Sequence, residues 1–441
     1  MFGRLPASVS VRLLVGVILS GTLSVLDSTI VVPLLGSIGE EFGGGTEVSW
    51  LVSAYLLAST VTIPLWGRWM DLRGERLPMW IALLVFLIGT IACVCAPSLW
   101  VLVLGRVVQG IGTGGVVPVG QAILAARCST QERAKLQIYY NVAYGTAAGL
   151  GPIVGGALLD VSWRWAFVLI IPFIFAVAFA LYGQLSPTPK SGELRPFDAL
   201  GSAIITIGLT VMLIGVERTS WWPIALGMLL LAWYVMRTKR VPNGPIPRGL
   251  LTHRAVMAAA FIGLLIGFVQ FSYLTYLPMF SESLNQSLNS GLVVVPLTVL
   301  WLSLGAFTGV LAVKFGSRMM MLAAILTAVP AGLIVIASFS LPTFFLASAL
   351  IGASAGFALI PALLLAQHAA PMADIGAATS SFVLFCNFGR ALGVAVVAVV
   401  LQRAGVNPAM VVLTVVALLV FVPYAMTPRK SAEQQLRSAQ L

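Results

Sequence analysis

The chain has 441 residues, of which 59% are hydrophobic and only 9% are charged, and its mean hydropathy is +1.02. One soluble core cannot cover so much apolar surface with polar residues, which excludes an ordinary soluble protein. The net charge of +11 does not indicate nucleic-acid binding, because the lysines and arginines cluster between apolar runs of about 20 residues, the length that crosses a bilayer. The composition predicts an integral membrane protein whose partner is the lipid bilayer and not a nucleic acid.

Hydropathy predicts an all-α integral membrane protein with fourteen transmembrane helices. The first six spans are 11–33, 48–67, 77–96, 98–124, 136–159 and 163–184. The next eight are 199–216, 221–236, 255–280, 290–313, 319–338, 341–366, 376–402 and 407–427. Most lysines and arginines fall in alternate loops, so the positive-inside rule places those loops and both termini in the cytoplasm. We therefore expect a multi-pass protein of the cell (inner) membrane.

A pattern of glycine and arginine occurs twice in the chain and predicts two related halves. Each copy ends a span and enters a loop with the same spacing: Gly67, Gly74 and Arg76, then Gly309, Gly316 and Arg318. Membrane transporters are often built from repeated halves. We predict a six-helix bundle over residues 1–184, an inserted transmembrane pair over 199–236 and a second six-helix bundle over 255–427.

Asp27, in the first span, is the only carboxylate well inside any predicted span. Removal from water favours the neutral form of a carboxylate unless a cation lies nearby, so a proton and a cationic substrate can compete for the same group. Such competition is the minimum that antiport requires, and it makes Asp27 a candidate for both proton coupling and substrate binding. The alternative is that Asp27 lies near the outer end of the span, hydrated or paired with an arginine.

The loop after the second span combines two glycines with several charges in one short turn. Its candidate conformational residues are Gly67, Asp71, Arg73 and Gly74. Asp71 lies at a helix junction, where a carboxylate can meet the positive N-terminus of a neighbouring helix and latch one conformation. The alternative is a plain positively charged cytoplasmic loop.

Arg106 lies inside the fourth span, in the run RVVQGIGTGG. An unpaired charge is costly there and usually faces the interior of the helix bundle, which singles out Arg106. Gln109 follows one helical turn later. The alternative is a structural arginine in a polar network.

The stretch from Gly145 to Arg164 predicts a helix-packing seam or a hinge. Small residues allow close approach of helices in lipid, and a proline inside a membrane helix needs neighbours that satisfy the carbonyl it frees. The residues assigned to this seam are Gly145, Gly149, Gly151, Pro152, Gly155 and Gly156.

Aromatic and amide side chains on spans expected to line a central cavity are candidates for substrate binding, because aromatic rings can hold an organic cation. They are Gln109, Tyr140, Asn141, Tyr144, Gln270, Tyr273, Tyr276 and Asn387. Arg390, in the span 376–402, joins this set. Packing and an interfacial position are the alternatives for the aromatic members.

These motifs resemble those of the major facilitator superfamily. The loop from Gly67 to Arg76 is similar to the superfamily signature between helices 2 and 3, although Glu75 stands where a base is usual. The run around Arg106 resembles the helix-4 motif, in which the arginine is linked to proton movement. The resemblance makes Arg106 the second candidate for proton coupling. The glycines from 145 to 156 resemble the helix-5 signature of exporters.

Two further stretches resemble the fourteen-helix drug:proton antiporter family: residues 26–31 and residues 163–167. The resemblance implies a proton-coupled antiporter that exports small amphipathic or cationic compounds (multidrug efflux) by alternating access. The proton gradient supplies the energy, and we expect no cofactor and no metal. Export of an endogenous lipid, peptide or metabolite on the same fold is the alternative. A membrane enzyme needs a nucleophile, base or metal cluster at one depth, and only Asp27 lies there, so we expect no enzyme.

Overall fold

The computed structural model describes residues 9–43, 48, 50–158, 161–186, 198–217, 220–241, 244, 246–284, 290–371 and 374–427. All regular secondary structure in these segments is helical. In a bilayer the backbone polar groups must be satisfied within the spanning segment, which a helix achieves alone. The predicted all-α fold is confirmed.

The N-terminal group of helices follows the predicted spans. It contains α1 (Val11–Ile30), α2 (Leu35–Phe42), α3 (Trp50–Arg73), α4 (Arg76–Val94), α5 (Leu99–Arg127), α6 (Thr130–Ala157) and α7 (Arg164–Leu181). A short 3-10 turn, Val32–Leu34, joins α1 to α2. The turn from α5 into α6 is fixed by a capping box, in which Ser129 and Glu132 satisfy each other's backbone N–H groups.

The rest of the chain begins with the pair α8 (Ala199–Glu217) and α9 (Trp221–Arg237). The C-terminal group then contains α10 (Arg248–Thr252), α11 (Arg254–Leu284), a 3-10 turn (Ser290–Val294), α12 (Val295–Phe315), α13 (Ser317–Ala337), α14 (Leu341–Ala369), α15 (Ile375–Ala404), α16 (Val406–Leu419) and α17 (Phe421–Met426).

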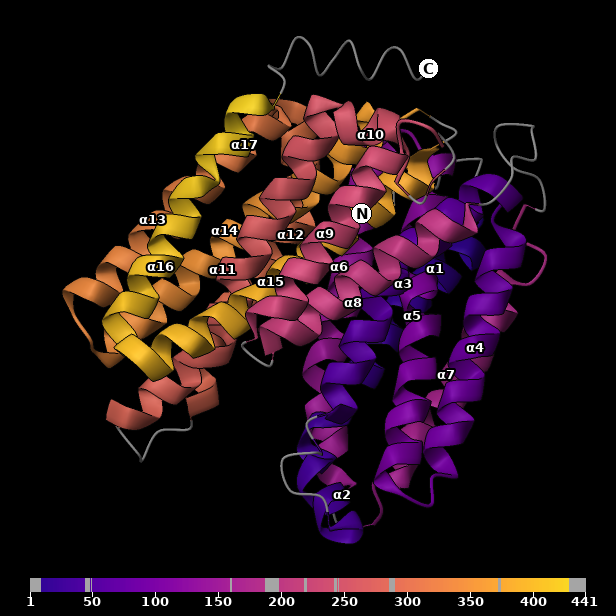
Figure 1. Cartoon of the computed structure of the whole chain (residues 1–441), viewed down its shortest axis with the longest axis horizontal. Coiled ribbons are helices and arrows are strands. Elements are labelled where there is room, and N and C mark those ends of the chain that lie inside the picture. Colours follow the sequence, from indigo (N-terminus) through magenta and orange to yellow (C-terminus); the bar gives the residue numbers. More distant parts are fainter. Residues whose placement is uncertain are drawn as a thin grey trace.

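Figure 1 shows the two groups side by side, with α1–α7 in indigo to purple and α11–α17 in salmon to yellow. They meet at the upper end of the view and diverge toward the lower end. The main contacts between them are α3 with α15 and α6 with α12. Helices α8 and α9 pack on each other, and α8 also contacts α3 and α15. The inserted pair therefore touches both groups.

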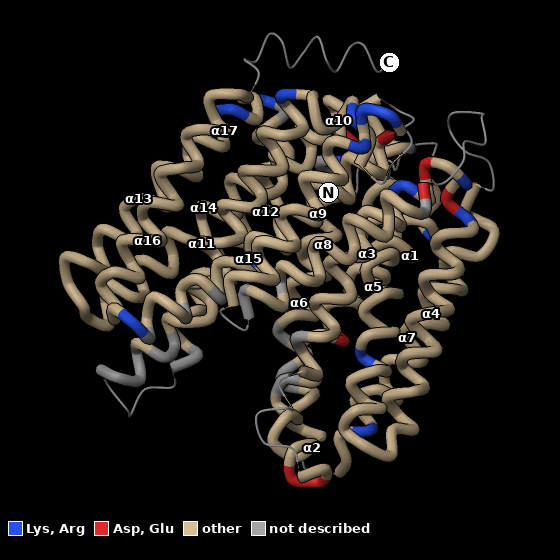
Figure 2. The backbone as a smooth tube through the Cα atoms, in the orientation of Figure 1, with Lys and Arg blue, Asp and Glu red and all other residues tan. Residues whose placement is uncertain are grey.

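Lysine and arginine gather at the end of the molecule where the two groups meet (Figure 2). In the described chain, eleven helices are long and apolar enough to cross a membrane. Helices α8 and α9 contribute shorter apolar segments, Leu200–Met212 and Trp221–Arg237. The total of fourteen spans, the domain boundaries and the cytoplasmic position of the termini stay predictions.

Glycines of α6 make close contacts on two sides. A Cβ at Gly151 would overlap Oγ1 of Thr29, and one at Gly155 would overlap the carbonyl oxygen of Ile30, so α6 lies directly against α1. Gly145 instead meets Leu302 of α12, in the other group. Helix α6 therefore links the first helix of one group to the second group, as a packing seam would.

Gly156 does not belong to this seam. A Cβ built there has no neighbour within 4 Å, because this face of the helix points away from α1. The surroundings of Gly149 and Pro152 lie outside the described residues.

The adjacent glycines 155 and 156 provide a matched test of the seam. We expect Gly155→Ala to destabilise the protein by about 1–3 kcal/mol, because the new methyl group collides with backbone that cannot move freely. Gly156→Ala should be neutral or stabilising, since alanine favours a helix more than glycine does. Thermal unfolding of both purified variants in one detergent measures the difference, and equal melting temperatures would contradict the packing described.

Candidate functional site

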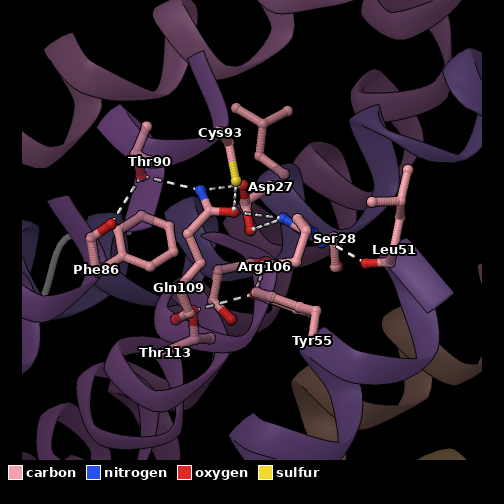
Figure 3. A network of polar contacts seen from close by, with 12 residues as sticks. Asp27, Ser28, Leu51, Tyr55, Phe86, Thr90, Cys93, Arg106, Gln109 and Thr113 are labelled. Carbon is pink, nitrogen blue, oxygen red and sulfur yellow. Dashed lines mark hydrogen bonds and ion pairs between the residues drawn. The ribbon is translucent and has the colours of Figure 1, made fainter. Parts of the chain in front are cut away.

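Asp27 on α1 and Arg106 on α5 form an ion pair inside the N-terminal group (Figure 3). Nη1 of Arg106 lies 2.9 Å from Oδ2 of Asp27, and neither residue is exposed to solvent. The two charges therefore neutralise each other in a dry environment. The hydrated alternative for Asp27 is excluded in this conformation, and the arginine-paired one is observed.

Gln109 lies one turn after Arg106 on the same face of α5 and hydrogen-bonds to both members of the ion pair. Its Oε1 accepts a hydrogen bond of 2.8 Å from Nη1 of Arg106. Its Nε2 donates to Oδ1 of Asp27 at 3.3 Å and to Oγ1 of Thr90 at 2.9 Å. The amide thus orders both charged groups and ties them to α4 (Figure 3).

Helix α3 supplies the remaining partners of the arginine. The guanidinium carbon lies 4.0 Å from the ring centroid of Tyr55, and Nε donates to the carbonyl oxygen of Leu51 at 3.1 Å. The Tyr55 hydroxyl donates to Thr113 at 3.1 Å. Nothing in the sequence distinguished Tyr55 from the other aromatic residues of the spans, because its role depends on which helix lies beside α5.

The glycines of RVVQGIGTGG explain how three helices converge on these side chains. A Cβ at Gly110 would lie 2.5 Å from the carbonyl oxygen of Tyr55, and one at Gly112 would lie 2.5 Å from the backbone nitrogen of Phe86. Helices α3 and α4 therefore contact the backbone of α5 itself, which brings their polar groups within hydrogen-bond distance of Arg106 and Gln109.

This arrangement corrects one prediction. Both carboxylate oxygens of Asp27 are engaged, so in this conformation Asp27 and Gln109 are not available to a substrate. Removing one partner of a buried ion pair costs about 3–5 kcal/mol, because the other charge is left uncompensated. A substrate that binds to Asp27 must first separate Asp27 from Arg106.

A second polar cluster joins the two groups at the end rich in lysine and arginine. Asp71, at the end of α3, accepts hydrogen bonds of 2.8 Å from the backbone nitrogens of both Gly376 and Ala377, in the first turn of α15. Arg68 forms an ion pair of 2.7 Å with Asp374. This is the helix-terminus contact predicted for Asp71 from the sequence.

The glycines of this loop have distinct roles. A Cβ at Gly67 would lie 2.5 Å from the carbonyl oxygen of Gly376, so glycine is needed for α3 to approach α15. Gly74 has a φ of 81°, which glycine adopts without strain. Arg73 is exposed, and no ion pair across the two groups involves it among the described residues.

Glu75 acts within the N-terminal group only. It is buried, forms an ion pair with Arg127 at the end of α5, and accepts a hydrogen bond of 3.2 Å from the backbone nitrogen of Ser186. Its acidic character is thus explained by a base on the neighbouring helix. A further contact between the groups, not foreseen from the sequence, is Arg133 Nη1 to Oε1 of Gln367 at 3.1 Å.

The opposite end of the N-terminal group is held by Trp163 and Arg164. The Trp163 indole donates to Glu41 at 2.6 Å, and Arg164 pairs with the same carboxylate at 2.8 Å. The indole hydrogen bond, followed by the Arg164 contacts, holds the pKa of the Glu41 carboxyl below its ordinary value. The corner therefore fixes α2 against the start of α7.

The remaining predicted substrate residues do not form one cluster. Tyr276 donates to the carbonyl oxygen of Val394 at 2.7 Å, so its hydroxyl is used for packing and not held open for a guest. Tyr140 and Tyr273 are buried, and Asn141 accepts a hydrogen bond of 3.2 Å from Gln137.

Arg390, Asn387 and Tyr144 lie closer to one another. Nη1 of Arg390 donates to Oδ1 of Asn387 at 3.1 Å, and Tyr144 of α6 is near enough to Arg390 to interact electrostatically. All three are partly exposed. Within the described residues, no group of three or more His, Cys, Asp or Glu side chains is placed to hold a metal ion.

Comparison with known proteins matches nearly the whole chain to one family. The profile described as the Major Facilitator Superfamily matches residues 17–394 and, again, 307–440. The chain is 27% identical over 414 residues to the multidrug transporter protein MdtP of Bacillus subtilis, covering 90% of this chain and 76% of that protein. It is 26% identical over 413 residues to the thioclapurine efflux transporter tcpA of Claviceps purpurea, covering 87% and 74%.

Among solved structures, the fold is similar to that of the human organic anion transporter MFSD10 (TETRAN). The TM-score is 0.73 at 19% identity, and the match covers 96% of this chain and 99% of the other. At this identity the likeness shows the fold alone. The predicted all-helical architecture of a transporter is confirmed.

The contact between Asp71 and α15 predicts how the closed end opens. Asp71→Ala removes both acceptors, which should weaken the contact by about 1–2 kcal/mol and raise the open population about 5- to 30-fold. A cysteine at Ser380, which is buried against Gly67, reports opening through its rate of modification by a water-soluble maleimide, with Cys95 replaced by serine. Arg73→Gln, in the same loop, is the control. Equal rates in Asp71→Ala and its parent would rule out the latch.

Proposed function

Because the chain belongs to the major facilitator superfamily, we propose that it is a proton-coupled antiporter that exports small amphipathic compounds by alternating access. Relatives with the printed names multidrug transporter and efflux transporter support export as the direction. The observation that carries proton coupling is the dry ion pair between Asp27 and Arg106.

Protonation of Asp27 changes the energy of this pair directly. A neutral carboxyl no longer compensates the guanidinium, so Arg106 gains by moving to another partner or toward water. In the ionised state the same two groups hold α1 and α5 together. The protonation state of one side chain is thereby linked to the arrangement of the helices around it, which is what an antiporter requires.

A continuous set of contacts leads from this pair to the other group. Thr29, two residues after Asp27, packs against Gly151 of α6. Six residues earlier on the same helix, Gly145 packs against Leu302 of α12. A shift of α1 therefore acts on α6, and α6 acts on the C-terminal group.

The present conformation fits the outward-facing stage of the cycle. Asp71, Arg68 and their partners on and before α15 close the end where the positive charges gather, which the positive-inside rule assigns to the cytoplasm. In the proposed cycle a proton from outside reaches Asp27, substrate leaves outward, the latch opens and the proton is released inward. Exchange of one proton for a neutral compound is driven by about 2.3 kcal/mol per 100 mV of membrane potential.

Export of an endogenous lipid, peptide or metabolite by the same cycle is the second candidate. A cationic substrate bound at Asp27 is less favoured than the sequence alone indicated, because the cation would have to replace Arg106. We therefore assign Asp27 and Arg106 to proton coupling.

Transport into inside-out vesicles tests the proposal. With an acidic lumen, the parent protein should accumulate a fluorescent amphipathic dye, and Asp27→Asn should reduce this proton-driven accumulation at least about tenfold, since the only proton acceptor at that depth is lost. Glu40→Gln, an acid-to-amide change at an exposed position of α2, should transport normally. Unimpaired accumulation by Asp27→Asn would refute coupling at this site.

A double variant separates coupling from stability. Asp27→Asn alone leaves Arg106 buried without a counter-ion and should lose about 3–5 kcal/mol of stability. Asp27→Asn with Arg106→Gln removes both charges, so thermal unfolding should show that stability returns while proton-driven transport does not. Return of transport together with stability would mean that the pair is only structural.

A further inference from the structure

Three charged residues lie in the middle of the predicted spans, and their charges do not sum to zero. Asp27 and Arg106 neutralise each other. Arg390 lies at the sixteenth position of the 30-residue helix α15 and forms no ion pair with any described acidic residue. Among the described residues, the middle of the predicted spans therefore carries one positive charge without an acidic partner, in the C-terminal group. An unpaired guanidinium at this depth is costly unless a counter-charge reaches it.

The hydrogen bond that Arg390 makes to the described residues involves only one of its three guanidinium nitrogens. Nη1 donates to Asn387, one turn earlier on α15. Nε is buried and has no hydrogen-bond partner among the described residues, and no bond from Nη2 to a described residue is found either. The Nε and Nη2 edge is the one that binds a carboxylate through two parallel hydrogen bonds.

Aromatic rings lie near the guanidinium. The guanidinium carbon lies 4.8 Å from the ring centroid of Phe271 on α11 and 6.0 Å from that of Trp301 on α12. Tyr144 approaches from α6 of the other group. Arg390, Phe271 and Trp301 are all partly exposed, so the charge does not lie in a sealed core.

The helix packing makes room for the arginine. A Cβ at Gly267 would lie 2.6 Å from the carbonyl oxygen of Cys386 and 3.4 Å from Cγ of Arg390, so α11 and α15 touch through glycine beside the arginine stem. Three residues further along α11, Gln270 is fully buried, and neither atom of its amide has a hydrogen-bond partner among the described residues. Buried amides are nearly always satisfied, so a polar partner for Gln270 is to be expected at some stage of the cycle.

We infer that Arg390 is a binding site for the anionic group of the exported compound, and that the substrates are amphipathic organic acids. This inference rests on the proposed export function and specifies its substrate class. The carboxylate takes the Nε and Nη2 edge, while Phe271 and Trp301 contact the apolar body of the compound. Asn387 is a positioning residue, because it fixes the guanidinium through Nη1.

The inference changes the charge balance of transport. Uptake of one proton with export of one monovalent anion moves two positive charges inward in each cycle. The same exchange with a monovalent cation moves none. An inside-negative potential should therefore accelerate export of an organic acid and leave export of a cation unaffected.

Binding of matched probes to the full-length protein in lipid nanodiscs tests the site without a proton gradient. The probes are 4-(1-pyrenyl)butyrate, its neutral amide and the corresponding trimethylammonium compound. Their binding is measured by energy transfer from tryptophan to pyrene.

The parent should bind the carboxylate at least about tenfold more tightly than the amide, as expected for a charge-assisted bidentate pair. Arg390→Gln should bind the carboxylate no better than the amide. Arg390→Lys should show an intermediate preference for the carboxylate, because lysine keeps the positive charge but lacks the two parallel N–H donors of a guanidinium.

Arg403→Gln is the matched control, because Arg403 is an exposed arginine of the same helix. Unchanged carboxylate binding in Arg390→Gln, or preference of the parent for the trimethylammonium probe, would overturn the inference. If Arg390→Gln also fails to bind the amide probe, Arg390→Lys provides the test. A preference for the carboxylate in Arg390→Lys as large as that of the parent would refute the bidentate site.

The outcomes also separate this inference from the export proposal. If the parent prefers the carboxylate but accumulates no probe under a proton gradient, the anion site stands and export is wrong. If the gradient drives the cationic probe while the carboxylate neither binds nor moves, export stands and the anion site is wrong.

Discussion

A carboxylate and a guanidinium that are both removed from water remain charged at low cost only while they stay together. The N-terminal group is organised around this constraint. Gln109 bonds to both charges, Tyr55 and Leu51 hold the guanidinium from α3, and the glycines of α5 admit the neighbouring helices. A pair held on all sides resists opening by a small displacement. In the proposed mechanism it opens when a proton neutralises Asp27.

In the proposed mechanism the two groups have different roles. The N-terminal group holds the ion pair of Asp27 and Arg106, to which we assign proton coupling, and the C-terminal group holds Arg390 beside aromatic rings. The proton and the guest therefore need not compete for one atom. In that mechanism, coupling travels through the contact of α6 with α12, and the hydrogen bonds from α15 to Asp71 hold the closed end together.

Features that depend on local sequence could be predicted. Hydropathy located the helices, and the rarity of charge inside apolar spans singled out Asp27 and Arg106. Long-range packing could not be predicted in the same way. Asp27 and Arg106 are 79 positions apart, and only the fold shows that they meet. The Tyr276 hydroxyl donates a hydrogen bond to a carbonyl oxygen of α15, and Glu75 forms an ion pair with Arg127 on a neighbouring helix. Neither contact could be predicted, because both depend on how the helices pack against one another.

The proposed mechanism requires that Asp27 changes protonation state during transport. Infrared difference spectroscopy of the protein in lipid membranes, recorded between alkaline and acidic buffer, observes this directly through the C=O stretch of a protonated carboxyl group. We expect a band that is present in the parent, absent in Asp27→Asn, and appears over the same pH range in which transport accelerates. A spectrum in which Asp27 remains ionised throughout that range would contradict proton coupling through the Asp27–Arg106 pair.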